Sequence, residues 1–346
     1  MPDILVEQQG TLGRIKLNRP KAINALTLDM IHDIAAALAQ FAAAPEIGTV
    51  LISGEGERGL CAGGDIRALY DHGRDGSGFG QDFFRDEYRM NAQIADYPKP
   101  YVAIMDGITM GGGVGVSAHG AIRIVTERTR IAMPETGIGF FPDVGGTWLL
   151  SRGPGELGTF IGLTGDGIGG ADAILAGFAD YFVPSEQIAS LVEALAALPA
   201  AVVVSQVHAM VRGFAIEATP PLGQHRAEID ASFGFESVEE IVAALEASGS
   251  AFAQKTLAVL RQKSPTSMKV TLRLLREAAR AATLRECLQR EFAAAHQVLA
   301  SDEFYEGVRA AVVDKDRSPK WRPATLAEVT PEALEPYFAH AVEAIF

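Results

Sequence analysis

Residues 101–115 read YVAIMDGITMGGGVG, and this stretch decides the fold class of the chain. The apolar run from Tyr101 to Met105 follows Pro98-Lys99-Pro100, which predicts a short buried strand. A helix is expected from Met110 to His119, although three consecutive glycines, residues 111–113, stand at its start. A glycine costs about 1 kcal/mol relative to alanine in a helix. Two explanations stay open: close packing against a neighbouring element, or backbone N–H groups that point at an anion.

Strands and helices alternate on both sides of this stretch. Strands are expected at residues 3–18 (two strands around a turn), 49–53 and 122–126, helices after Thr27 as N-cap and at about 81–96, and loops at 54–64 and 71–80. The alternation continues to about residue 190 and predicts the α/β class, for which a doubly wound sheet is the usual arrangement. No Gly-x-Gly-x-x-Gly follows a strand, so the pattern does not favour a dinucleotide site.

The C-terminal half has a different character and is expected to be mainly helical. Helices are predicted within residues 186–260, around a loop at 219–221, and then after Ser264-Pro265-Thr266-Ser267, at about 283–299 and at 304–313. We therefore predict two regions. Residues 1–190 form the core with the site, and residues 191–346 complete the site and are candidates for mediating homo-oligomerisation.

Composition excludes several classes of protein. Of 346 residues, 43 are acidic and 30 basic, which gives a formal net charge of −13. This acidity argues against a nucleic-acid partner, because phosphates require a basic surface. No uncharged apolar run reaches the ~20 residues of a membrane-spanning helix, and the N-terminal segment lacks the features of a signal peptide. We expect a cytoplasmic protein without a membrane partner.

Other catalytic arrangements find little support. Two cysteines, Cys61 and Cys287, are too few for a disulfide scaffold or a thiolate zinc cluster, and the seven histidines have no ligand spacing. Ser117 and His119 are two residues apart on the expected helix and so point to different faces. No Gly-x-Ser-x-Gly turn is present either. Neither a metal site nor a serine triad is therefore expected.

Two further stretches contain candidate chemistry. Residues 61–67, CAGGDIR, place two glycines before an aspartate at an expected loop-to-helix junction, which by itself is typical of a turn with an N-cap. Residues 132–146, AMPETGIGFFPDVGG, place Glu135 and Asp143 among apolar residues, where burial raises the pKa of a carboxyl group. Asp143 can also be interpreted as the cap of a helix that begins near Val144, and Glu135 as part of a buried ion pair.

Together these three stretches resemble the enoyl-CoA hydratase/isomerase (crotonase) superfamily, and within it the hydrolase subgroup that acts on 3-hydroxyisobutyryl-CoA. Two late segments extend the resemblance over nearly the whole chain: residues 264–267 (SPTS) and residues 306–310 (EGVRA), the latter followed by residues 314–321. The resemblance implies a crotonase-like spiral of ββα units with a helical C-terminal region, in place of a doubly wound sheet. It also implies that the substrate is a CoA thioester.

The same resemblance implies roles for individual residues. Gly64 and Gly112 match the oxyanion-hole positions, whose backbone N–H groups bind the thioester oxygen, and Glu135 and Asp143 match catalytic carboxylates. The matching substrate-binding positions are Ala25, Asp65 and Ile66 at the nucleotide end of CoA, Lys315 near its phosphates, and Glu87 near the acyl group. No cofactor is implied, since CoA is part of the substrate.

Gly115 is the informative departure from the commoner hydratases. Their corresponding position holds one of two catalytic glutamates, and here it has no side chain; the second carboxylate is instead Asp143, where hydratases usually have glycine. The resemblance therefore implies hydrolysis of 3-hydroxyisobutyryl-CoA to 3-hydroxyisobutyrate and CoA, a reaction of valine catabolism. Glu135 either attacks the carbonyl carbon or activates water. Enoyl-CoA hydration or isomerisation, and non-catalytic acyl-CoA binding, are the alternatives.

Overall fold

The computed structural model describes residues 2–339 and 342–346, and the chain packs as two compact units. The first unit comprises residues up to Gly64, Arg89–Ile131 and Ile168–Pro221. The second comprises Asp65–Tyr88, Ala132–Gly167 and the residues from Leu222 onward. The units therefore alternate along the chain. The division predicted at residue 190 followed the change from alternating strands and helices to helices alone, and it remains a prediction.

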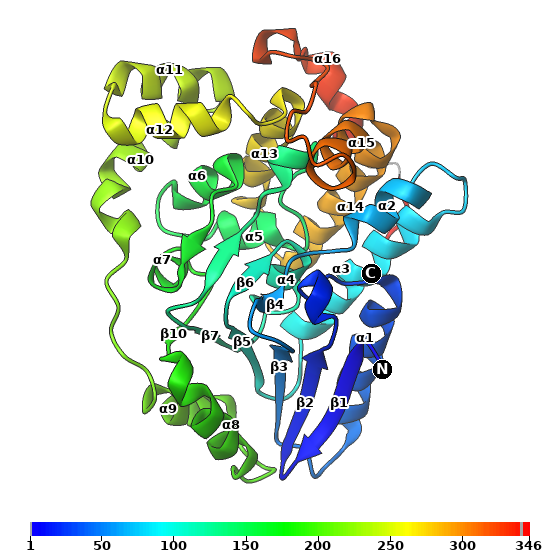
Figure 1. The fold of residues 1–346 in the computed structure, drawn as a ribbon, viewed down its shortest axis with the longest axis vertical. Helices are drawn as coiled ribbons and strands as arrows, with labels where there is room; N and C mark the ends of the chain where they lie inside the picture. Colours follow the sequence, from blue (N-terminus) through cyan, green and yellow to red (C-terminus); the bar gives the residue numbers. More distant parts are fainter. Residues whose placement is uncertain (1, 340–341) are drawn as a thin grey trace. The chain divides into compact units, whose positions relative to one another are not determined.

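A six-stranded sheet is the centre of the first unit (Figure 1). Its strands, in spatial order, are β1 (Ile4–Gln9), β2 (Leu12–Leu17), β3 (Thr49–Gly54), β5 (Tyr101–Met105), β7 (Ile122–Val125) and β10 (Tyr181–Phe182). Only the pair β1–β2 is antiparallel, as the tight turn between these strands requires, and the other pairs are parallel. Strand β5 is buried along its whole length, which explains its uninterrupted apolar sequence.

Helices cover this sheet and close its core. Those of the first unit are α1 (Leu28–Ala43), α4 (Gly112–Gly115), α7 (Gly170–Leu175), α8 (Ile188–Ala196) and α9 (Val204–Arg212), with the 3-10 turns η1 (Pro20–Ala22) and η3 (Ser185–Gln187). Helix α1 begins as predicted at Thr27, whose side chain accepts a hydrogen bond from the Met30 N–H. Side chains of α8 and α9, among them Leu191 and Val207, share one hydrophobic core with Leu51 and Val102 of the sheet.

A second, four-stranded sheet of short strands brings the glycine-rich segments together. Its strands are β4 (Gly59–Cys61), β6 (Ile108–Met110), β8 (Arg130–Ala132) and β9 (Ile168–Gly169). The loop expected at 54–64 therefore contains a strand, and the helix expected from Met110 to His119 is wrong in its extent, because only α4 forms there. The three glycines disfavour a long helix, and Met110 is the last residue of β6, the strand that pairs with β4 through Ile108 and Thr109.

The second unit is almost entirely helical, as expected for the C-terminal half. Its helices are α2 (Ile66–His72), α5 (Gly146–Leu150), α6 (Leu157–Thr164), α10 (Arg226–Phe233), α11 (Val238–Ser248), α12 (Ala251–Leu260), α13 (Pro265–Ala278), α14 (Leu284–Ala300), α15 (Asp302–Val308) and α16 (Pro331–Leu334). Short turns accompany them: η2 (Glu135–Ile138), η4 (Pro221–His225), the π-helical η5 (Arg309–Val313), η6 (Leu326–Glu328) and η7 (Glu335–Tyr337). Helix α3 (Phe79–Ala95) contributes its residues up to Tyr88 to this unit.

Local sequence explains where the central helices of the second unit begin. Ser264 caps α13 by accepting a hydrogen bond from the Ser267 N–H, and Pro265 occupies the first turn, where its missing N–H costs nothing. Helix α13 packs against α5 and α6, and α14 packs against α5. Helix α15 packs against η2. These contacts place the segment 132–146 among buried helices.

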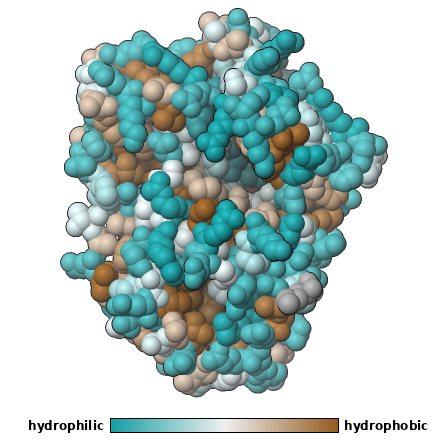
Figure 2. All heavy atoms as spheres, viewed as in Figure 1, coloured by the Kyte–Doolittle hydropathy of each residue, from teal (hydrophilic) through white to brown (hydrophobic). Residues whose placement is uncertain are grey.

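Figure 2 shows hydrophilic residues over most of the face in view, with hydrophobic residues scattered among them. Large exposed hydrophobic residues are Val6, Val203, Val204, Ile216, Phe235 and Phe346. Among the described residues, no helix is both long and apolar enough to cross a bilayer.

Candidate active site

A glycine corner in the first unit carries both residues that the sequence assigned to an oxyanion hole. Strand β4 leads to Gly64, and β6 leads through Gly111 to Gly112. Because β4 and β6 pair in parallel, the two loops that follow them lie side by side: a Cβ built on Gly63 would be 3.9 Å from the Gly112 nitrogen. Gly111 has φ +48° and ψ −119°, a conformation that only glycine adopts readily, and it turns the chain into α4. The corner therefore requires glycine at position 111.

The backbone N–H groups of this corner are available to a ligand. Leu26 bridges Gly64 by donating a hydrogen bond of 2.9 Å to the Gly63 carbonyl. Among the described residues, no hydrogen-bond acceptor takes the N–H of Gly64 or of Gly112. Gly112 is the first residue of α4, where a helical N–H has no partner within the helix. Two such amides are what an oxyanion hole needs.

Ala25 lies in the first unit and directly precedes Leu26, the residue that forms a β-bridge with Gly64 of this corner. Its carbonyl accepts a hydrogen bond from the Arg19 guanidinium, and the buried Asn24 amide donates to the carbonyls of Glu55 and Gly59. This network fixes the loop on which Ala25 lies, and Ala25 itself is half-buried. Its assignment to the nucleotide end of CoA stays a prediction.

Glu135 opens the 3-10 turn η2 of the second unit and is buried. Its Oε2 has no hydrogen-bond partner among the described residues. Burial, together with the charge of Asp143, raises the pKa of Glu135 well above its ordinary value. A buried carboxyl oxygen without a partner is rare in folded proteins and is typical of a catalytic group. The ion pair considered from the sequence does not form: no salt bridge to Glu135 is found among the described residues, although Lys263 lies near enough to oppose the rise in pKa.

Asp143 is also buried, at the turn before α5. Its Oδ2 accepts a hydrogen bond of 2.8 Å from the Tyr88 hydroxyl. Burial and the charge of Glu291 raise the pKa of Asp143 to about 8, although the Tyr88 hydrogen bond acts in the opposite direction. Helix α5 begins after Gly145, and Asp143 does not cap it with its side chain. The capping interpretation of Asp143 is therefore wrong.

The residue that does bond the start of α5 is Glu291, which sequence reasoning missed. Glu291 lies on α14 and is fully buried. Its carboxylate accepts hydrogen bonds from the Gly145 N–H (2.7 Å) and the Thr147 N–H (3.1 Å), and also from the Thr147 hydroxyl. Burial raises the pKa of Glu291 to about 7. A glutamate 144 residues away gives no local sequence signal for this contact.

Glu87 completes a group of buried carboxyl side chains in the second unit. It precedes Tyr88 on α3, and its Oε1 has no hydrogen-bond partner among the described residues. Burial and the charge of Asp143 raise the pKa of Glu87 well above its ordinary value. The charges of Glu87 and Asp143 also act on Glu135, so the second unit brings together three of the carboxylates that the sequence singled out. Repulsion among them disfavours ionisation of all three at once.

Aromatic rings explain why these carboxylates are so poorly solvated. The ring of Phe140 stacks on that of Phe141, with centroids 4.6 Å apart, and on that of Phe84 at 5.4 Å. Tyr88 meets the edge of Phe292 at 6.4 Å. A carboxyl group within such an apolar wall binds its proton more tightly than in water. The described residues nevertheless contain no cluster of three or more His, Cys, Asp or Glu side chains arranged to hold a metal ion.

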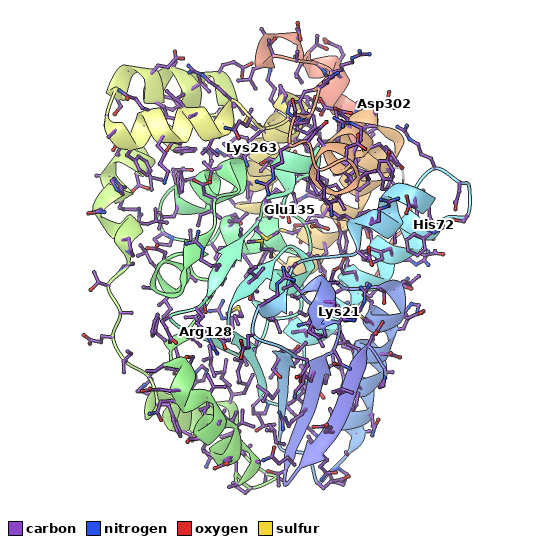
Figure 3. The ribbon with its side chains drawn as sticks, viewed as in Figure 1. Lys21, His72, Arg128, Glu135, Lys263 and Asp302 are labelled. Atoms are coloured by element: carbon purple, nitrogen blue, oxygen red, sulfur yellow. The ribbon has the colours of Figure 1, made fainter. Side chains whose placement is uncertain are left out.

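Lys263 is the second residue that the sequence did not single out. It stands directly before the SPTS segment that opens α13, and Figure 3 labels it together with Glu135. Its ammonium nitrogen is 3.6 Å from a Cβ built on Gly137 in η2, and 3.5 Å from one built on Gly165. Burial lowers the pKa of Lys263, while the charges of Asp166 and Glu135 raise it. Lys263 is therefore a cation held against the turn that carries Glu135.

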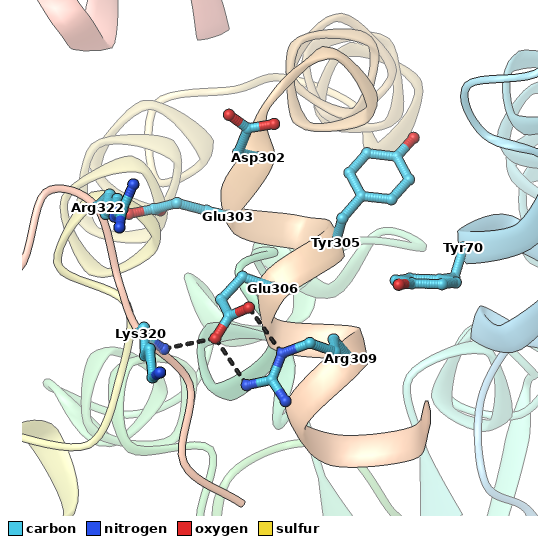
Figure 4. A pocket seen from close by; sticks show the side chains of 8 residues that line it. All are labelled: Tyr70, Asp302, Glu303, Tyr305, Glu306, Arg309, Lys320 and Arg322. Atoms are coloured by element: carbon cyan, nitrogen blue, oxygen red, sulfur yellow. Dashed lines mark hydrogen bonds and ion pairs between the residues drawn. The ribbon is translucent and has the colours of Figure 1, made fainter. Parts of the chain in front are cut away.

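A separate pocket of about 350 Å³ in the second unit lies next to α15 (Figure 4). Its lining residues are Tyr70, Asp302, Glu303, Tyr305, Glu306, Arg309, Lys320 and Arg322. Glu306 pairs with the Arg309 guanidinium and accepts a hydrogen bond from the Lys320 N–H. The side chains of Lys320 and Arg322 form no ion pair with the described residues. The pocket therefore combines two tyrosine rings with both acidic and basic side chains, and Lys320 and Arg322 are the basic ones that form no ion pair within 4 Å among the described residues.

The predicted nucleotide-end residues of the second unit have different relations to this pocket. The Asp65 side chain caps α2 by accepting a hydrogen bond from the Ala68 N–H, and Ile66 is the first residue of α2, the helix that presents Tyr70 to the pocket. Lys315 is exposed and does not line the pocket. It lies between Asp314 and Asp316, both of which pair with Arg309. Lys320 and Arg322 belong to the segment after the EGVRA motif, so sequence proximity could have indicated them.

Comparison with known proteins identifies the family. A family model described as enoyl-CoA hydratase/isomerase matches residues 12–338. The chain is similar to the mitochondrial 3-hydroxyisobutyryl-CoA hydrolases of Danio rerio (46% identical over 97% of this chain and 89% of that protein) and Homo sapiens (44% over 97% and 88%).

Solved structures agree with this assignment. A crystal structure described as a carnitinyl-CoA dehydratase from Mycobacterium thermoresistibile matches with a TM-score of 0.92 and 46% identity, over 98% of this chain and 97% of that one. One described as an enoyl-CoA hydratase from Rhodobacter sphaeroides matches with a TM-score of 0.90 and 43% identity, over 98% and 97%. The predicted crotonase-like α/β fold is thereby confirmed, and the chain belongs to the enoyl-CoA hydratase/isomerase family.

Proposed function

We propose that this chain hydrolyses 3-hydroxyisobutyryl-CoA to 3-hydroxyisobutyrate and CoA, a step of valine breakdown. One observation carries the proposal: Glu135, Asp143 and Glu87 form a buried carboxyl group cluster, while Gly115 offers no side chain. A hydratase of this family would need the second glutamate at position 115. The hydrolase names of relatives that match 97% of this chain support the same reaction.

The thioester oxygen is the group that gains negative charge in this reaction. We assign its stabilisation to the N–H groups of Gly64 and Gly112, which have no other acceptor among the described residues. One oxyanion-hole donor is worth about 3–4 kcal/mol of transition-state stabilisation. Both donors are backbone groups, so they need no reorganisation during the reaction. The structure of the glycine corner supports this role through its paired strands and its required glycine conformation.

Glu135 supplies either the nucleophile or the base. In the first route its carboxylate oxygen attacks the thioester carbon, the C–S bond breaks, and CoA leaves as thiolate; water then cleaves the mixed anhydride. In the second route Glu135 takes a proton from water, whose oxygen attacks the same carbon. Both routes consume one water and release one acid and one thiol. Both require Glu135 in its ionised form.

Asp143 and Glu87 have a different task under this proposal. Burial raises the pKa of Asp143 to about 8, which favours its protonated form at neutral pH, and raises the pKa of Glu87 well above its ordinary value. A neutral carboxyl group can donate a hydrogen bond, which a carboxylate cannot. We propose that Asp143 and Glu87 bind the 3-hydroxyl group and the carbonyl side of the acyl chain. Neutral partners also lower the repulsion that opposes ionisation of Glu135.

The pocket beside α15 suits the nucleotide end of CoA. We assign the purine to the rings of Tyr70 and Tyr305 and the phosphates to Lys320 and Arg322, all of which line this pocket (Figure 4). Asp65 and Ile66 begin the helix that carries Tyr70, which is consistent with their predicted position at the same end of CoA. Lys315, which the resemblance assigned to the phosphates, stays a candidate. It is exposed, and its neighbours Asp314 and Asp316 both pair with Arg309. Ala25 is proposed for the same end of CoA from the resemblance alone.

Enoyl-CoA hydration or dehydration is the second candidate, because two structures at 43–46% identity are described by such activities. A panel of acyl-CoA esters separates the candidates. Release of free thiol is followed with 3-hydroxyisobutyryl-, 3-hydroxypropionyl- and 3-hydroxybutyryl-CoA, and loss of enoyl absorbance with crotonyl-CoA. Thiol release that is fastest with 3-hydroxyisobutyryl-CoA supports hydrolysis. Hydration of crotonyl-CoA without thiol release contradicts it, and tight binding without turnover indicates an acyl-CoA-binding protein.

Compartment and assembly are the remaining proposals. The vertebrate relatives are named mitochondrial, whereas the composition of this chain led to a cytoplasmic prediction. We propose the cytoplasm, to be tested by fractionation of the source cells. A homo-oligomer is proposed from the superfamily resemblance, to be tested by light scattering. No cofactor beyond the CoA of the substrate is proposed.

A further inference from the structure

The turn that carries Asp143 has an unusual backbone. Val144 has φ +54° and Gly145 has φ +75°, so two consecutive residues adopt the left-handed conformation. Glycine adopts this conformation freely, but a β-branched valine does so only at the expense of strain. Strained residues of this kind persist only where surrounding contacts hold them, and they cluster at functional sites. The position of Asp143 therefore depends on whatever holds the turn.

Contacts from another helix hold it. Glu291 on α14 accepts hydrogen bonds from the N–H groups of Gly145 and Thr147, at 2.7 and 3.1 Å, and from the Thr147 hydroxyl. Glu291 has no exposed surface, so these bonds do not compete with water. Helix α14 spans 17 residues from Leu284 to Ala300 and gives Glu291 a rigid base. Three donors from one turn thus converge on a single buried carboxylate.

The same carboxylate also lies within electrostatic reach of Asp143. The charge of Glu291 raises the pKa of Asp143, in addition to the effect of burial. The other titratable groups near this pair are Tyr88 and Glu87 on α3, Glu135 on η2 and Cys287 on α14. Arg152 and Arg290 act on Cys287. Glu291 therefore combines a mechanical and an electrostatic connection to Asp143, without being one of the acyl-site residues proposed above.

We propose that Glu291 is a positioning residue for Asp143: its carboxylate fixes the strained turn at residues 143–146 and sets its negative charge beside the Asp143 carboxyl group. The inference rests on the proposed function only in that Asp143 serves hydrolysis. The connection between Glu291 and the titration of Asp143 can be tested without any substrate.

The decisive variant is Glu291→Gln, which preserves shape but removes the charge and places an NH₂ group where one oxygen accepted a hydrogen bond. Aspartate labelled with ¹³C at the side-chain carboxyl, with its Asp143 signal assigned by Asp143→Asn, reports the titration of Asp143. We expect the midpoint for Asp143 to fall by about one pH unit, because a negative charge beside it is lost. In thiol-release assays we expect kcat to fall at least tenfold, with KM within threefold of wild type.

Two variants separate charge from position. Glu291→Asp keeps the charge but withdraws the carboxylate by one methylene, so kcat should fall while the Asp143 midpoint stays within about 0.3 unit. Thr147→Val removes only the hydroxyl donor and tests the same turn if Glu291→Gln does not fold. Val298→Ala is the matched control, since it removes buried methyl groups from the same helix about 10 Å further along its axis. It should change neither kcat nor the titration.

Folded Glu291→Gln protein with an unchanged Asp143 midpoint, or with kcat within threefold of wild type, overturns the proposal. A loss of activity equal to the loss of folded protein, with an unchanged midpoint, also counts against it. If the wild-type protein releases no thiol from any ester, the proposed function fails, yet the titration still decides the link between Glu291 and Asp143.

Discussion

The Tyr88 hydroxyl donates a hydrogen bond of 2.8 Å to Oδ2 of Asp143, and both side chains are buried. This bond favours the ionised form of Asp143, but burial and the nearby Glu291 favour the neutral form more strongly, so the pKa of Asp143 is about 8. Tyr88 cannot give up its proton to compensate, since burial raises its own pKa well above the ordinary value. Asp143 therefore favours its protonated form at neutral pH, and in the proposed mechanism Glu135 is the group that has to ionise.

The first prediction concerns Glu135. Glu135→Gln should lower kcat for thioester hydrolysis by at least a thousandfold, because an amide is neither a nucleophile nor a base. Binding should persist, since glutamine keeps nearly the same shape, and the Kd of a CoA ester measured by calorimetry should change less than fivefold. Activity within tenfold of wild type would remove Glu135 from the chemistry. Gln262→Glu, an exposed change close to Lys263, is a suitable control for charge alone.

The second prediction concerns stability and pH. The folded protein holds the protons of Asp143, Glu87 and Glu135 more tightly than the unfolded chain, since burial raises their pKa values. Their contribution to the free energy of unfolding is therefore complete below about pH 4 and is lost as pH rises through the folded-state values. Asp143→Asn should remove part of this loss. The free energy of unfolding of Asp143→Asn should exceed that of wild type by about 1–3 kcal/mol at pH 9 and by much less at pH 5, with a correspondingly higher thermal midpoint at pH 9.

Differential scanning calorimetry at both pH values tests this prediction. Asparagine can still accept the Tyr88 hydrogen bond, so the change isolates the charge. A gain in stability of the same size at pH 5 and pH 9 would show that the ionisation of Asp143 is not the cause. Asp302→Asn is a control, because Asp302 is almost fully exposed.

The third prediction concerns Lys263. Its positive charge lowers the pKa of Glu135, against the effect of burial. Lys263→Met should therefore raise the pKa of Glu135, move the acid limb of the kcat–pH profile upward by about half a unit to one unit, and reduce kcat at pH 7 about threefold to tenfold. Activity should recover at higher pH. Lys263→Arg should restore the wild-type profile because it keeps the charge.

Lys255→Met is the matched control for Lys263, since it removes an exposed lysine from α12 in the same unit. A profile that drops in height at every pH, with no shift along the pH axis, would mean that Lys263 only supports the fold.

The fourth prediction concerns the pocket beside α15. The double variant Lys320→Ala/Arg322→Ala should raise KM for the CoA ester about threefold to tenfold, with kcat within twofold, because the part of the substrate that we assign to these cations does not react. The same acyl group on pantetheine, which lacks the nucleotide, should show no difference between variant and wild type. Lys315→Ala should have a smaller effect. If Lys315→Ala alone raised KM as much as we expect for the double variant, Lys315 and not the pair Lys320 and Arg322 would bind the phosphates.

Sequence reasoning succeeded where the signal is local. The strand 101–105, the cap Thr27 and the SPTS opening of α13 all follow from apolar runs, capping residues and proline, which act within a few residues of themselves. It failed at residues 110–119, where a helix was expected. The glycines there lower helix propensity, and Met110 ends β6, a strand that pairs with β4, which is distant in sequence.

The sequence alone determined the α/β class, the family resemblance, the absence of a side chain at Gly115 and the two carboxylates Glu135 and Asp143, because motifs and residue identities are properties of the chain. Only the tertiary structure decided how those carboxylates are charged and held. Glu291 reaches the turn of Asp143 from another helix, and Lys263 reaches the turn of Glu135 from beyond residue 260. Burial, hydrogen bonds and Coulomb interactions depend on distance in space, which a sequence does not state.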